Sequence, residues 1–537
     1  MTNQAEDLMV AIQNQRIYQV GASPLVWGIM ETLGIEELTD EQCPPGDQTI
    51  SHGRTTVGMV LNRLIKPKAM YKVGEWLGKT GLADWLGHPA EEFNDDRLGR
   101  TLDAISDQTE ELWMKIVGRA LKSYPKLAGE FIHYDLTSCY FEGKYAASEL
   151  AEYGYSRDHR PDTKQINLGV SVIGESKLPL MYELLAGNTT DCKTPLPHVT
   201  KLKRVLNAVK YPHRIVLVGD RAMFNQELIE GYLKEAVLFL GPWTPPDVRT
   251  LMRAVTTAEL MDHPLSFQPQ SARADDPPTY YGVLRTFDFA ADDQPVPLQV
   301  LIVYSRGKAK LDRQLRDNHL DKVLTRLADI QTKLNRRRYK HEAYVRQQLA
   351  NTFKKFRAAK GLITWTLTST EGDLTLSFAP DEAAIAAAAQ IDGRYALVTN
   401  ASLSADEMLI QFKAQCCSEH RFSILKGPVP LRPIHLRTDR RITALVFLTM
   451  LALLVYSILE WLIRQSTAQN KRPWTGRTIL ETFEDFAVTA LLFPDGSVAW
   501  LPPPFSEAQR TLWDVLHLPD VSTFFAEIGS PRFYCGT

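Results

Sequence analysis

Three carboxylates stand out in this sequence because each interrupts an otherwise regular pattern. Asp135 lies inside the apolar run FIHYDLT, Asp220 ends the run HRIVLVGD, and Glu419 lies in the helical stretch QFKAQCCSEHRFSILKG. Strand interiors disfavour Asp, and an ionised carboxylate in a core is costly unless it is paired or binds a cation. A lone strand Asp is more often a surface or capping group. Two on neighbouring strands, with a third acid downstream, instead predict a site.

The chemistry of such a site follows from its ligand type. Carboxylates from separate elements suit hard, oxygen-seeking cations. A pair of Mg²⁺ or Mn²⁺ ions about 4 Å apart can activate a nucleophile and stabilise the leaving oxygen in phosphodiester cleavage. We therefore predict that Asp135, Asp220 and Glu419 are both the catalytic residues and the metal ligands of an enzyme that acts on DNA.

Cysteine and histidine offer a rival site in the same helical stretch. Cys416, Cys417 and His420 could in principle bind zinc or undergo redox chemistry. Adjacent cysteines on a helix point about 100° apart, and the chain has no CxxC pair to supply further ligands. Packing is the stronger interpretation for both cysteines. The six cysteines of the chain form no disulfide framework, which indicates a reducing compartment.

Composition adds few constraints. The 537 residues carry a formal net charge of −2, with 44% hydrophobic and 23% charged residues, so there is no global signal for nucleic-acid binding. The N-terminus MTNQAEDLMVAIQNQ is acidic where a signal peptide needs positive charge. We expect a cytoplasmic protein of two or three units.

The elements that position the three acids can be located from hydrophobic periodicity. Residues 1–128 have helical spacing and capping residues, and are predicted to form an all-α N-terminal domain. From 129 to 243 the pattern predicts three antiparallel strands, a helix near 195–209, and then a strand, a helix and a strand. This is the first part of an α/β core, with Asp220 where its fourth strand ends.

The second half of the chain is less regular. Residues 244–390 are predicted to be an insertion with short strands and a long basic helical stretch, 391–465 to be the second part of the core, and 466–537 to be a C-terminal tail. One helix is expected from about Ala405 to Leu425. On it Phe412, Glu419 and Lys426 are seven residues apart and would lie nearly on one line.

The segment ITALVFLTMLALLVYSILEWLI, residues 442–463, is long and apolar enough to cross a bilayer. Its isolation, its hydroxyl residues and the presence of Glu460 favour a helix buried on all sides in a large core. A membrane-anchored protein is the alternative.

The order Asp135, Asp220, Glu419 on strand, strand and helix resembles the DDE transposases of bacterial insertion sequences. The group with the signature Tyr-(2)-Arg-(3)-Glu-(6)-Lys is the most similar, and here the same spacing reads Phe412, Gln415, Glu419 and Lys426. The resemblance spans about residues 15 to 525. Further blocks resemble the family in the expected order: VLNRLIKPKAMYKVGEWLGKT, FNDDRLGRTLD, YDLTSCYFEG, GYSRDHRPDTKQINLGV, LPLMYELLAGNTTDCKT and VLVGDRAMFN.

The resemblance implies an α/β fold, in which an RNase H-like mixed sheet flanked by helices is interrupted by the β-rich and helical insertion. It also implies that Lys426 contacts a phosphate at the DNA end. Phe412 and Gln415 occupy the positions of the Tyr and Arg that touch this end in the family. Phe412 lacks the hydroxyl group, and Gln415 lacks the charge for a bidentate phosphate contact.

Other basic residues are candidates for DNA contact. Arg63, Lys66, Lys68 and Lys72 make the N-terminal domain a candidate DNA-binding domain, although they could equally form an ordinary polar face. The loop GYSRDHRPDTKQ and the basic helical stretch within residues 244–390 are open to the same two interpretations, contact with DNA or an ordinary solvated surface. The remaining candidates are Arg157, Arg160, Lys164, Arg221, Arg336, Arg337 and Arg338.

The function implied is that of a mobile-element transposase. It would use two divalent metal ions to cut double-stranded DNA at the element's ends and would join the freed 3′-hydroxyl to target DNA. The resemblance further implies a homodimer on DNA, no membrane contact, and a nucleoid-associated place in the bacterial cytoplasm. Because Phe412 and Gln415 depart from the signature, a degenerate or domesticated protein that binds DNA ends without strand transfer is the alternative.

Overall fold

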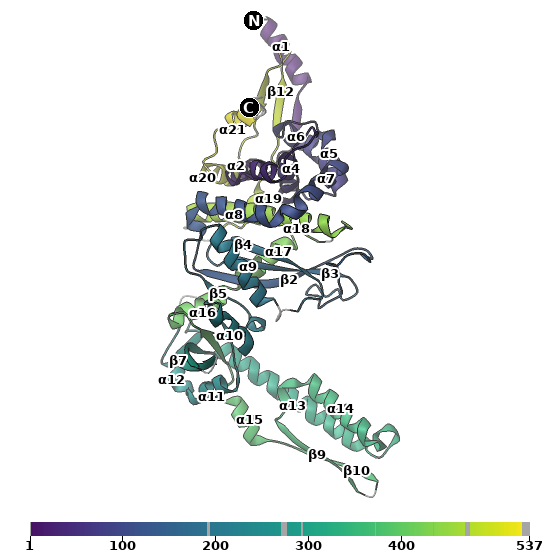
Figure 1. The fold of residues 1–537 in the computed structure, drawn as a ribbon, viewed down its shortest axis with the longest axis vertical. Helices are drawn as coiled ribbons and strands as arrows, with labels where there is room; N and C mark the ends of the chain where they lie inside the picture. Colours follow the sequence, from purple (N-terminus) through teal and green to yellow (C-terminus); the bar gives the residue numbers. More distant parts are fainter. Residues whose placement is uncertain are drawn as a thin grey trace. The chain divides into compact units, whose positions relative to one another are not determined.

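The computed structural model describes residues 2–190, 194–269, 276–291, 294–370, 372–432, 434–467 and 473–528 (Figure 1). The chain forms two compact units. Unit 1 comprises Met1–Met223, Gly231–Val237 and Ala414–Thr537, and unit 2 comprises Phe224–Glu230 and Leu238–Lys413. The three predicted catalytic acids therefore all belong to unit 1, although Glu419 is far from the other two in the sequence.

The sheet of unit 1 begins with an antiparallel meander. Strands β2 (Phe131–Tyr140), β3 (Gln165–Ile173) and β4 (Pro179–Ala186) pair in sequence, as the hydrophobic runs predict. Strand β5 (Val216–Val218) then pairs parallel to β2 on its other edge, which gives the order β4-β3-β2-β5. The mixed α/β class is confirmed by this sheet and by the helices around it.

Helices dominate the chain before the sheet. Their apolar faces supply the buried side chains Leu25, Ile29, Leu61, Leu98 and Ile116. Strand β1 (Arg16–Tyr18) pairs with β12 (Val488–Leu492), which also pairs with β13 (Val498–Leu501). The helices of this region are α1 (Thr2–Gln13), α2 (Ser23–Leu33), α3 (Ile35–Gln42), α4 (His52–Ile65), α5 (Val73–Thr80), α6 (Leu82–Trp85), α7 (Asp95–Ile105) and α8 (Thr109–Ser123).

The apolar segment 442–463 lies within helix α18 (Asp439–Ser466), which forms the centre of unit 1. It packs against α2, α4, α7 and α8 on one side and β4 on the other (Figure 1). By length and composition this helix could span a membrane, but 94% of its most apolar window is buried within the fold. The hydroxyls of Thr449 and Ser457 donate to Leu445 O and Leu453 O, so these polar groups are satisfied inside the helix. The segment is thus buried, as its composition predicts.

A fully buried ion pair joins α18 to α17 (Cys416–Leu425). The Arg421 guanidinium donates to Glu460 Oε2 at 2.8 Å and to Lys177 O at 2.6 Å, and the side chains of Arg421 and Glu460 are each only 1% exposed. Glu460 Oε1 accepts from Gly476 N at 3.1 Å and pairs with Arg464 at 3.0 Å. Burial alone would raise the pKa of Glu460, but Arg421, Arg464 and the Gly476 amide outweigh it and lower that pKa.

The remaining elements of unit 1 complete its layers. Residues of α9 (Pro195–Ala208) contact α8 and β4, and α19 (Gly476–Thr482) contacts α18 and α20. The rings of Phe483, Phe486 and Phe505 pack around Trp513 of α20 (Glu507–Val515). The chain's last described helix is α21 (Val521–Ile528). Helix α10 (Gln226–Lys234) follows β5, as predicted, and contributes residues to both units.

Unit 2 has its own strands, in the antiparallel order β6-β11-β8-β7. Their bounds are β6 Leu238–Pro242, β7 Tyr280–Ala291, β8 Gln294–Ser305 and β11 Arg394–Thr399. Two short helices, α11 (Pro246–Ala254) and α12 (Thr257–Met261), lie before β7, and α16 (Ala405–Lys413) follows β11. Strands predicted within the insertion are thus present as β7 and β8, but each is 12 residues long rather than short.

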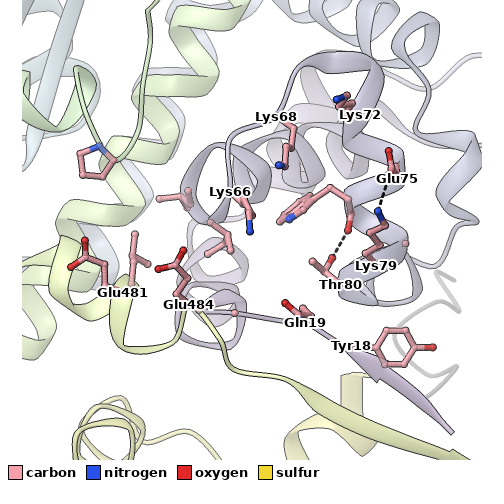
Figure 2. Close-up of a pocket in the computed structure, with 18 of the residues that line it drawn as sticks. Tyr18, Gln19, Lys66, Lys68, Lys72, Glu75, Lys79, Thr80, Glu481 and Glu484 are labelled. Atoms are coloured by element: carbon pink, nitrogen blue, oxygen red, sulfur yellow. Dashed lines mark hydrogen bonds and ion pairs between the residues drawn. The ribbon is translucent and has the colours of Figure 1, made fainter.

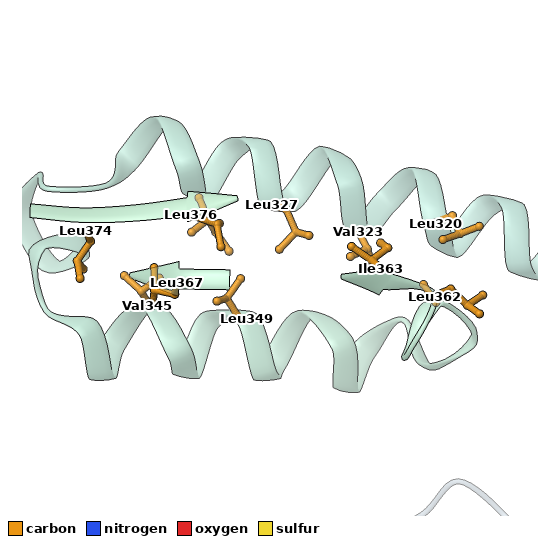
Figure 3. Packing of buried hydrophobic residues seen from close by; sticks show 12 residues of the cluster. Leu320, Val323, Leu327, Val345, Leu349, Leu362, Ile363, Leu367, Leu374 and Leu376 are labelled. Atoms are coloured by element: carbon orange, nitrogen blue, oxygen red, sulfur yellow. The ribbon is translucent and has the colours of Figure 1, made fainter. Parts of the chain in front are cut away.

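The basic stretch of unit 2 forms an arm with a core of its own (Figure 3). Helices α13 (Arg306–Lys333) and α14 (Glu342–Lys355) pack with the hairpin of β9 (Ile363–Thr370) and β10 (Asp373–Pro380). Leu327, Ile330, Val345 and Leu349 are fully buried between them. Helix α15 (Glu382–Ala389) then leads back to β11. Most lysines and arginines lie on the outside of this arm because its inner face is apolar, but Arg316 of α13 is buried and pairs with Asp392 at 2.6 Å.

The single helix expected from about Ala405 to Leu425 is wrong. Helix α16 ends at Lys413 and α17 begins at Cys416, with a turn at Ala414 and Gln415. At this turn the backbone bonds tighten, since Cys417 N donates to Ala414 O and Ser418 N to Gln415 O, each three residues back. Phe412 and Glu419 therefore do not share one helix face, and they belong to different units.

The buried ion pair leads to a stability prediction. Glu460→Leu leaves the Arg421 guanidinium buried without its carboxylate, so unfolding should become easier by about 3–5 kcal/mol. The double change Arg421→Met with Glu460→Leu removes both charges and should recover most of that loss. Denaturant midpoints measure the effect. Glu481→Gln, which breaks the exposed pair with Arg477, is the control and should cost less than about 1 kcal/mol. A double variant as unstable as Glu460→Leu would contradict this account.

Candidate active site

The register of two parallel strands places Asp135 beside Asp220. His133 of β2 is paired with Val218 of β5, and each Asp lies two residues beyond its member of this pair. Parallel strands run in the same direction, so two steps along each lead to the same end of the sheet. Asp135 is half-buried within the longer strand β2, whereas Asp220 is exposed just after the shorter β5. The apolar runs of the sequence single out both acids as candidates, and the pairing of β2 with β5 places them at the same end of the sheet.

Helix α17 brings Glu419 to the same strand. It packs on β2, where Ser418 Oγ donates to His133 O at 3.5 Å. Glu419 is the next residue and is exposed. Its negative charge acts on Asp135, as does that of Asp220. The three predicted acids are therefore electrostatic neighbours in unit 1.

Gln415 fixes the backbone beside Asp220. With the amide oriented to satisfy both partners, its nitrogen donates to Gly219 O at 3.2 Å and its oxygen accepts from Asp220 N at 2.9 Å. An arginine could donate to Gly219 O but has no acceptor for Asp220 N. Gln415 thus positions the acid loop in this protein, a role that its place in the signature does not predict.

The electrostatics of the site centre on Asp135. The pKa of its carboxyl is raised to about 7, chiefly by burial and to a smaller extent by the negative charges of Asp220 and Glu419. The Leu136 amide, which donates to Asp135 Oδ1 at 2.7 Å, and the positive charge of Arg157 oppose this effect. Near neutral pH the carboxyl therefore holds a proton for much of the time. A nearby cation would favour the ionised form.

The side-chain chemistry of Asp135, Asp220 and Glu419 suits a divalent cation. All three are acids that offer only oxygen, and their mutual repulsion is what a bound cation would relieve. A small cavity of about 10 Å³ lies between the two strands and is lined by Tyr134, Asp135, Leu136, Asp220, Ala222 and Met223. That space is about one water molecule in size. Within the described residues, no group of three His, Cys, Asp or Glu side chains lies close enough together to hold a metal ion.

The zinc or redox alternative gains no support from the described residues. Burial raises the pKa of the Cys417 thiol to about 12, so it is not a thiolate at neutral pH. Cys416 is exposed on the adjoining face, and both cysteines are free. Burial lowers the pKa of His420, and no cluster that could hold a metal includes it. Cys417 packs in the core, as the helix geometry predicts.

Lys426, the predicted phosphate ligand, pairs with a carboxylate of its own chain. Its ammonium lies 2.8 Å from Asp158 Oδ1, and Arg432 lies 2.8 Å from Asp158 Oδ2. The Asp158 side chain is 4% exposed, and the side chains of Lys426 and Arg432 are 21% and 24% exposed. Sequence patterns gave no signal for Arg432 or Asp158. The loop that carries Asp158 does contain three of the predicted basic residues.

Those three basic residues lie around the same cluster. Arg160 binds Asp162 and lies over the Tyr140 ring at 5.1 Å, and Arg432 lies over the same ring at 5.5 Å. Lys164 donates to Tyr145 O at 3.1 Å. Arg157 is near enough to Asp135 to act on its pKa. Arg160 and Lys426 thus belong to the group around Tyr140 and Asp158 in unit 1, and Arg157 of the same loop lies near Asp135.

The other predicted DNA contacts lie in other segments of the chain. Arg221 is exposed directly after Asp220. Phe412 packs at a ring distance of 6.1 Å from Tyr395 within unit 2, so it fills space there. Arg336, Arg337 and Arg338 are exposed in the turn between α13 and α14 of the arm.

Comparisons with known proteins identify limited similarity. Residues 15–118 match the model of a domain of unknown function, DUF4277. No curated protein matches. Among solved structures, the piggyBac transposase synaptic complex with hairpin DNA is 8% identical, with 93% of this chain and 81% of that chain covered and a TM-score of 0.38. The Mos1 transposase paired-end complex with the left transposon end is 13% identical, with 36% and 60% covered and a TM-score of 0.16.

The raised pKa of Asp135 predicts how stability depends on pH. Ionisation of this carboxyl costs nothing below its ordinary pKa of 3.8, because both folded and unfolded chains are then protonated. The cost grows as the pH rises from 3.8 to about 7 and is constant above that range. Asp135→Asn should therefore melt higher than the parent without divalent ions, and the gain should be larger above pH 7 than near pH 4.

Thermal melting at several pH values checks this prediction, with Glu175→Gln as the control because Glu175 is an exposed acid between β3 and β4. Added Mg²⁺ or Mn²⁺ should raise the melting temperature of the parent and have less effect on Asp135→Asn. A parent that melts higher than Asp135→Asn above pH 7 without metal would show that the carboxyl is not held in this environment.

Proposed function

We propose that this protein is a metal-dependent DNA transposase of the DDE type. The observation that carries the proposal is the parallel pairing of β2 with β5, which sets Asp135 and Asp220 side by side, with Glu419 close enough to act on Asp135. Three oxygen-donor acids on two strands and a helix suit phosphodiester chemistry. The resemblance of the sequence to insertion-sequence transposases agrees with this arrangement.

In this proposal the three acids are the metal ligands and catalytic residues. Two divalent cations, Mg²⁺ or Mn²⁺, would supply an activated nucleophile and stabilise the leaving oxygen when bound. Asp135 must lose its proton to bind a cation, so the affinity for the metal should rise as the pH rises toward about 7 and level off above it. Gln415 holds the backbone on which Asp220 is carried. DNA would be cut at the element's ends, and the 3′-hydroxyl would then attack target DNA in line.

Basic residues near the acids would bind the DNA backbone. Lys426 and Arg432 are held together by Asp158, whose carboxylate occupies them as a phosphate would. A DNA phosphate would therefore compete with Asp158 for these cations. Arg157, Arg160, Lys164 and Arg221 would contact the DNA near the acids, and Arg336, Arg337 and Arg338 would do so from the arm.

The parts of the chain would have separate roles in this proposal. Residues 1–128 would be the DNA-binding domain, 129–243 and 391–465 the two parts of the catalytic core, 244–390 the insertion and 466–537 the tail. A homodimer on DNA would hold two ends at once, in the bacterial cytoplasm. Residue Asp191, a further candidate acid, lies outside the described residues.

A second candidate function is DNA-end binding without strand transfer. Phe412 packs against Tyr395 and presents no hydroxyl, and the Gln415 amide is bound to the Asp220 loop rather than presenting a positive charge. Both signature contacts to the DNA end would then be lost.

Cleavage of end-containing DNA by the purified chain tests the proposal. The parent should cut with Mg²⁺ or Mn²⁺, and Asp135→Asn, Asp220→Asn and Glu419→Gln should each lose at least about a hundredfold in rate. Glu175→Gln is the matched control and should cut like the parent. Binding of the same DNA, measured without metal, should survive in all four variants.

The outcomes separate the two functions. Loss of cleavage in the three acid variants with retained binding and folding supports the transposase. A parent that binds ends but never cuts would favour the DNA-end-binding protein. Cutting that continues in a folded Asp220→Asn variant would contradict the three-acid site.

Asp158 gives a separate prediction about DNA affinity. Asp158→Asn removes the charge that neutralises Lys426 and Arg432, so DNA should bind several times more tightly and with a steeper dependence on salt. Fluorescence anisotropy across a salt series measures this, and Glu175→Gln, which removes an exposed acid and leaves the ion pairs of Asp158 and Asp162 intact, is the control. Weaker binding by a variant that melts like the parent would contradict competition between Asp158 and phosphate.

A further inference from the structure

We propose that unit 1 has a second nucleic-acid site, a basic cavity between the N-terminal helices and α19 that takes a phosphodiester backbone (Figure 2). The proposal rests on the proposed function, because it assumes that DNA is the substrate. It adds a binding surface separate from the three acids. The cavity has a volume of about 1170 Å³, larger than the 300–1,000 Å³ that is typical of small-molecule sites. A polymer suits this size better than a small ligand does.

One wall of the cavity is made of lysines on the segment from α4 to α5. Lys66, Lys68 and Lys72 line it, and Lys66 and Lys72 are exposed. In Figure 2 the labelled lysines lie along one side of the space. In the described residues, the ammonium groups of Lys66 and Lys68 have no ion pair. Of the lining side chains, six are basic and three are acidic.

The backbone beneath these lysines is fixed by a buried side chain. Asn62, which is 2% exposed, donates to Lys66 O at 3.0 Å and accepts from Lys68 N at 3.0 Å. Pro67 lies between the two lysines and limits the turn further. Two cations are thus held one residue apart on a rigid turn. Such preorganisation lowers the entropy lost when an anionic strand binds.

The cavity is also tied to the segment that follows Lys426. Gly427 and Pro428 form part of its lining, and Arg63 of α4 donates to Pro430 O at 3.3 Å. The lysine wall therefore belongs to the same unit as the three acids and is joined to the end of α17. A strand held by the lysines would lie against the segment that begins one residue after the proposed phosphate ligand.

The opposite wall of the cavity carries acids. Removal of one of these acids should therefore affect DNA binding in the opposite direction to removal of a lysine. Glu481 and Glu484 face the space from the α19 side, and Figure 2 shows them across from Lys66. Glu481 is paired with Arg477, and Glu75 with Lys79. The hydrogen bond from Lys79 lowers the pKa of Glu75, with smaller effects of Lys72 and Lys68. Glu484 has no ion pair in the described residues, so its charge opposes an anionic ligand.

The test is DNA binding by the full chain without divalent metal, so that it does not depend on cleavage. Fluorescent single-stranded and double-stranded oligonucleotides are titrated across salt concentrations, and their difference identifies which form the cavity takes. Lys66→Gln with Lys68→Gln should weaken binding about tenfold or more and lower the slope of log affinity against log salt by about 2, since each phosphate contact contributes nearly 1. Glu484→Gln should strengthen binding.

Lys122→Gln with Lys126→Gln removes two exposed lysines outside the cavity and is the matched control, which should bind like the parent. Melting temperatures verify that each variant is folded. A Lys66→Gln/Lys68→Gln variant with unchanged affinity and slope would overturn the inference, as would an equal loss in the control. If the parent never cuts DNA but shows this dependence on lysine, the proposed function fails and the inference stands.

Discussion

The buried pair of Arg421 and Glu460 is the interaction on which the arrangement of unit 1 depends. It joins the helix that carries Glu419 to the central helix α18, and further contacts join Arg421 to Lys177 O and Glu460 to Arg464 and Gly476 N. Two charges that are each 1% exposed are tolerable only when paired and hydrogen-bonded. A change that moves α17 would break these contacts, so the position of Glu419 over β2 is tied to the core. The same pair explains why an acid is present in a helix that is otherwise apolar enough to cross a membrane.

Unit 1 places unfavourable charges where the proposed chemistry needs them. The parallel rung of His133 with Val218 sets Asp135 beside Asp220, and burial with two negative neighbours raises the pKa of Asp135 to about 7. This is a cost to folding that a bound cation would offset. Cations of the chain are likewise held against acids, with Asp158 between Lys426 and Arg432. In the proposed function, a bound cation would offset the cost at Asp135, and a DNA phosphate would take the place of Asp158 beside Lys426 and Arg432.

Sequence patterns predict the strands well because strands depend on local periodicity. The three runs that become β2, β3 and β4 alternate or are continuously apolar, and an Asp within such a run is visible without a structure. The break between α16 and α17 is not visible, because Ala414 and Gln415 are both good helix formers and the turn is set by tertiary contacts such as that of Gln415 with Gly219. The pairing of Asp158 with Lys426 joins residues 268 positions apart, which no local pattern can reveal.

In the proposed function, Asp135, Asp220 and Glu419 together bind the catalytic cations. Anomalous scattering from crystals of the full chain grown with Mn²⁺ and a DNA end would locate those ions directly. The account predicts manganese peaks within coordination distance of all three carboxylates, with Glu419 drawn toward the two strands. Manganese bound elsewhere, or bound by the two aspartates with Glu419 directed away in the presence of DNA, would contradict it.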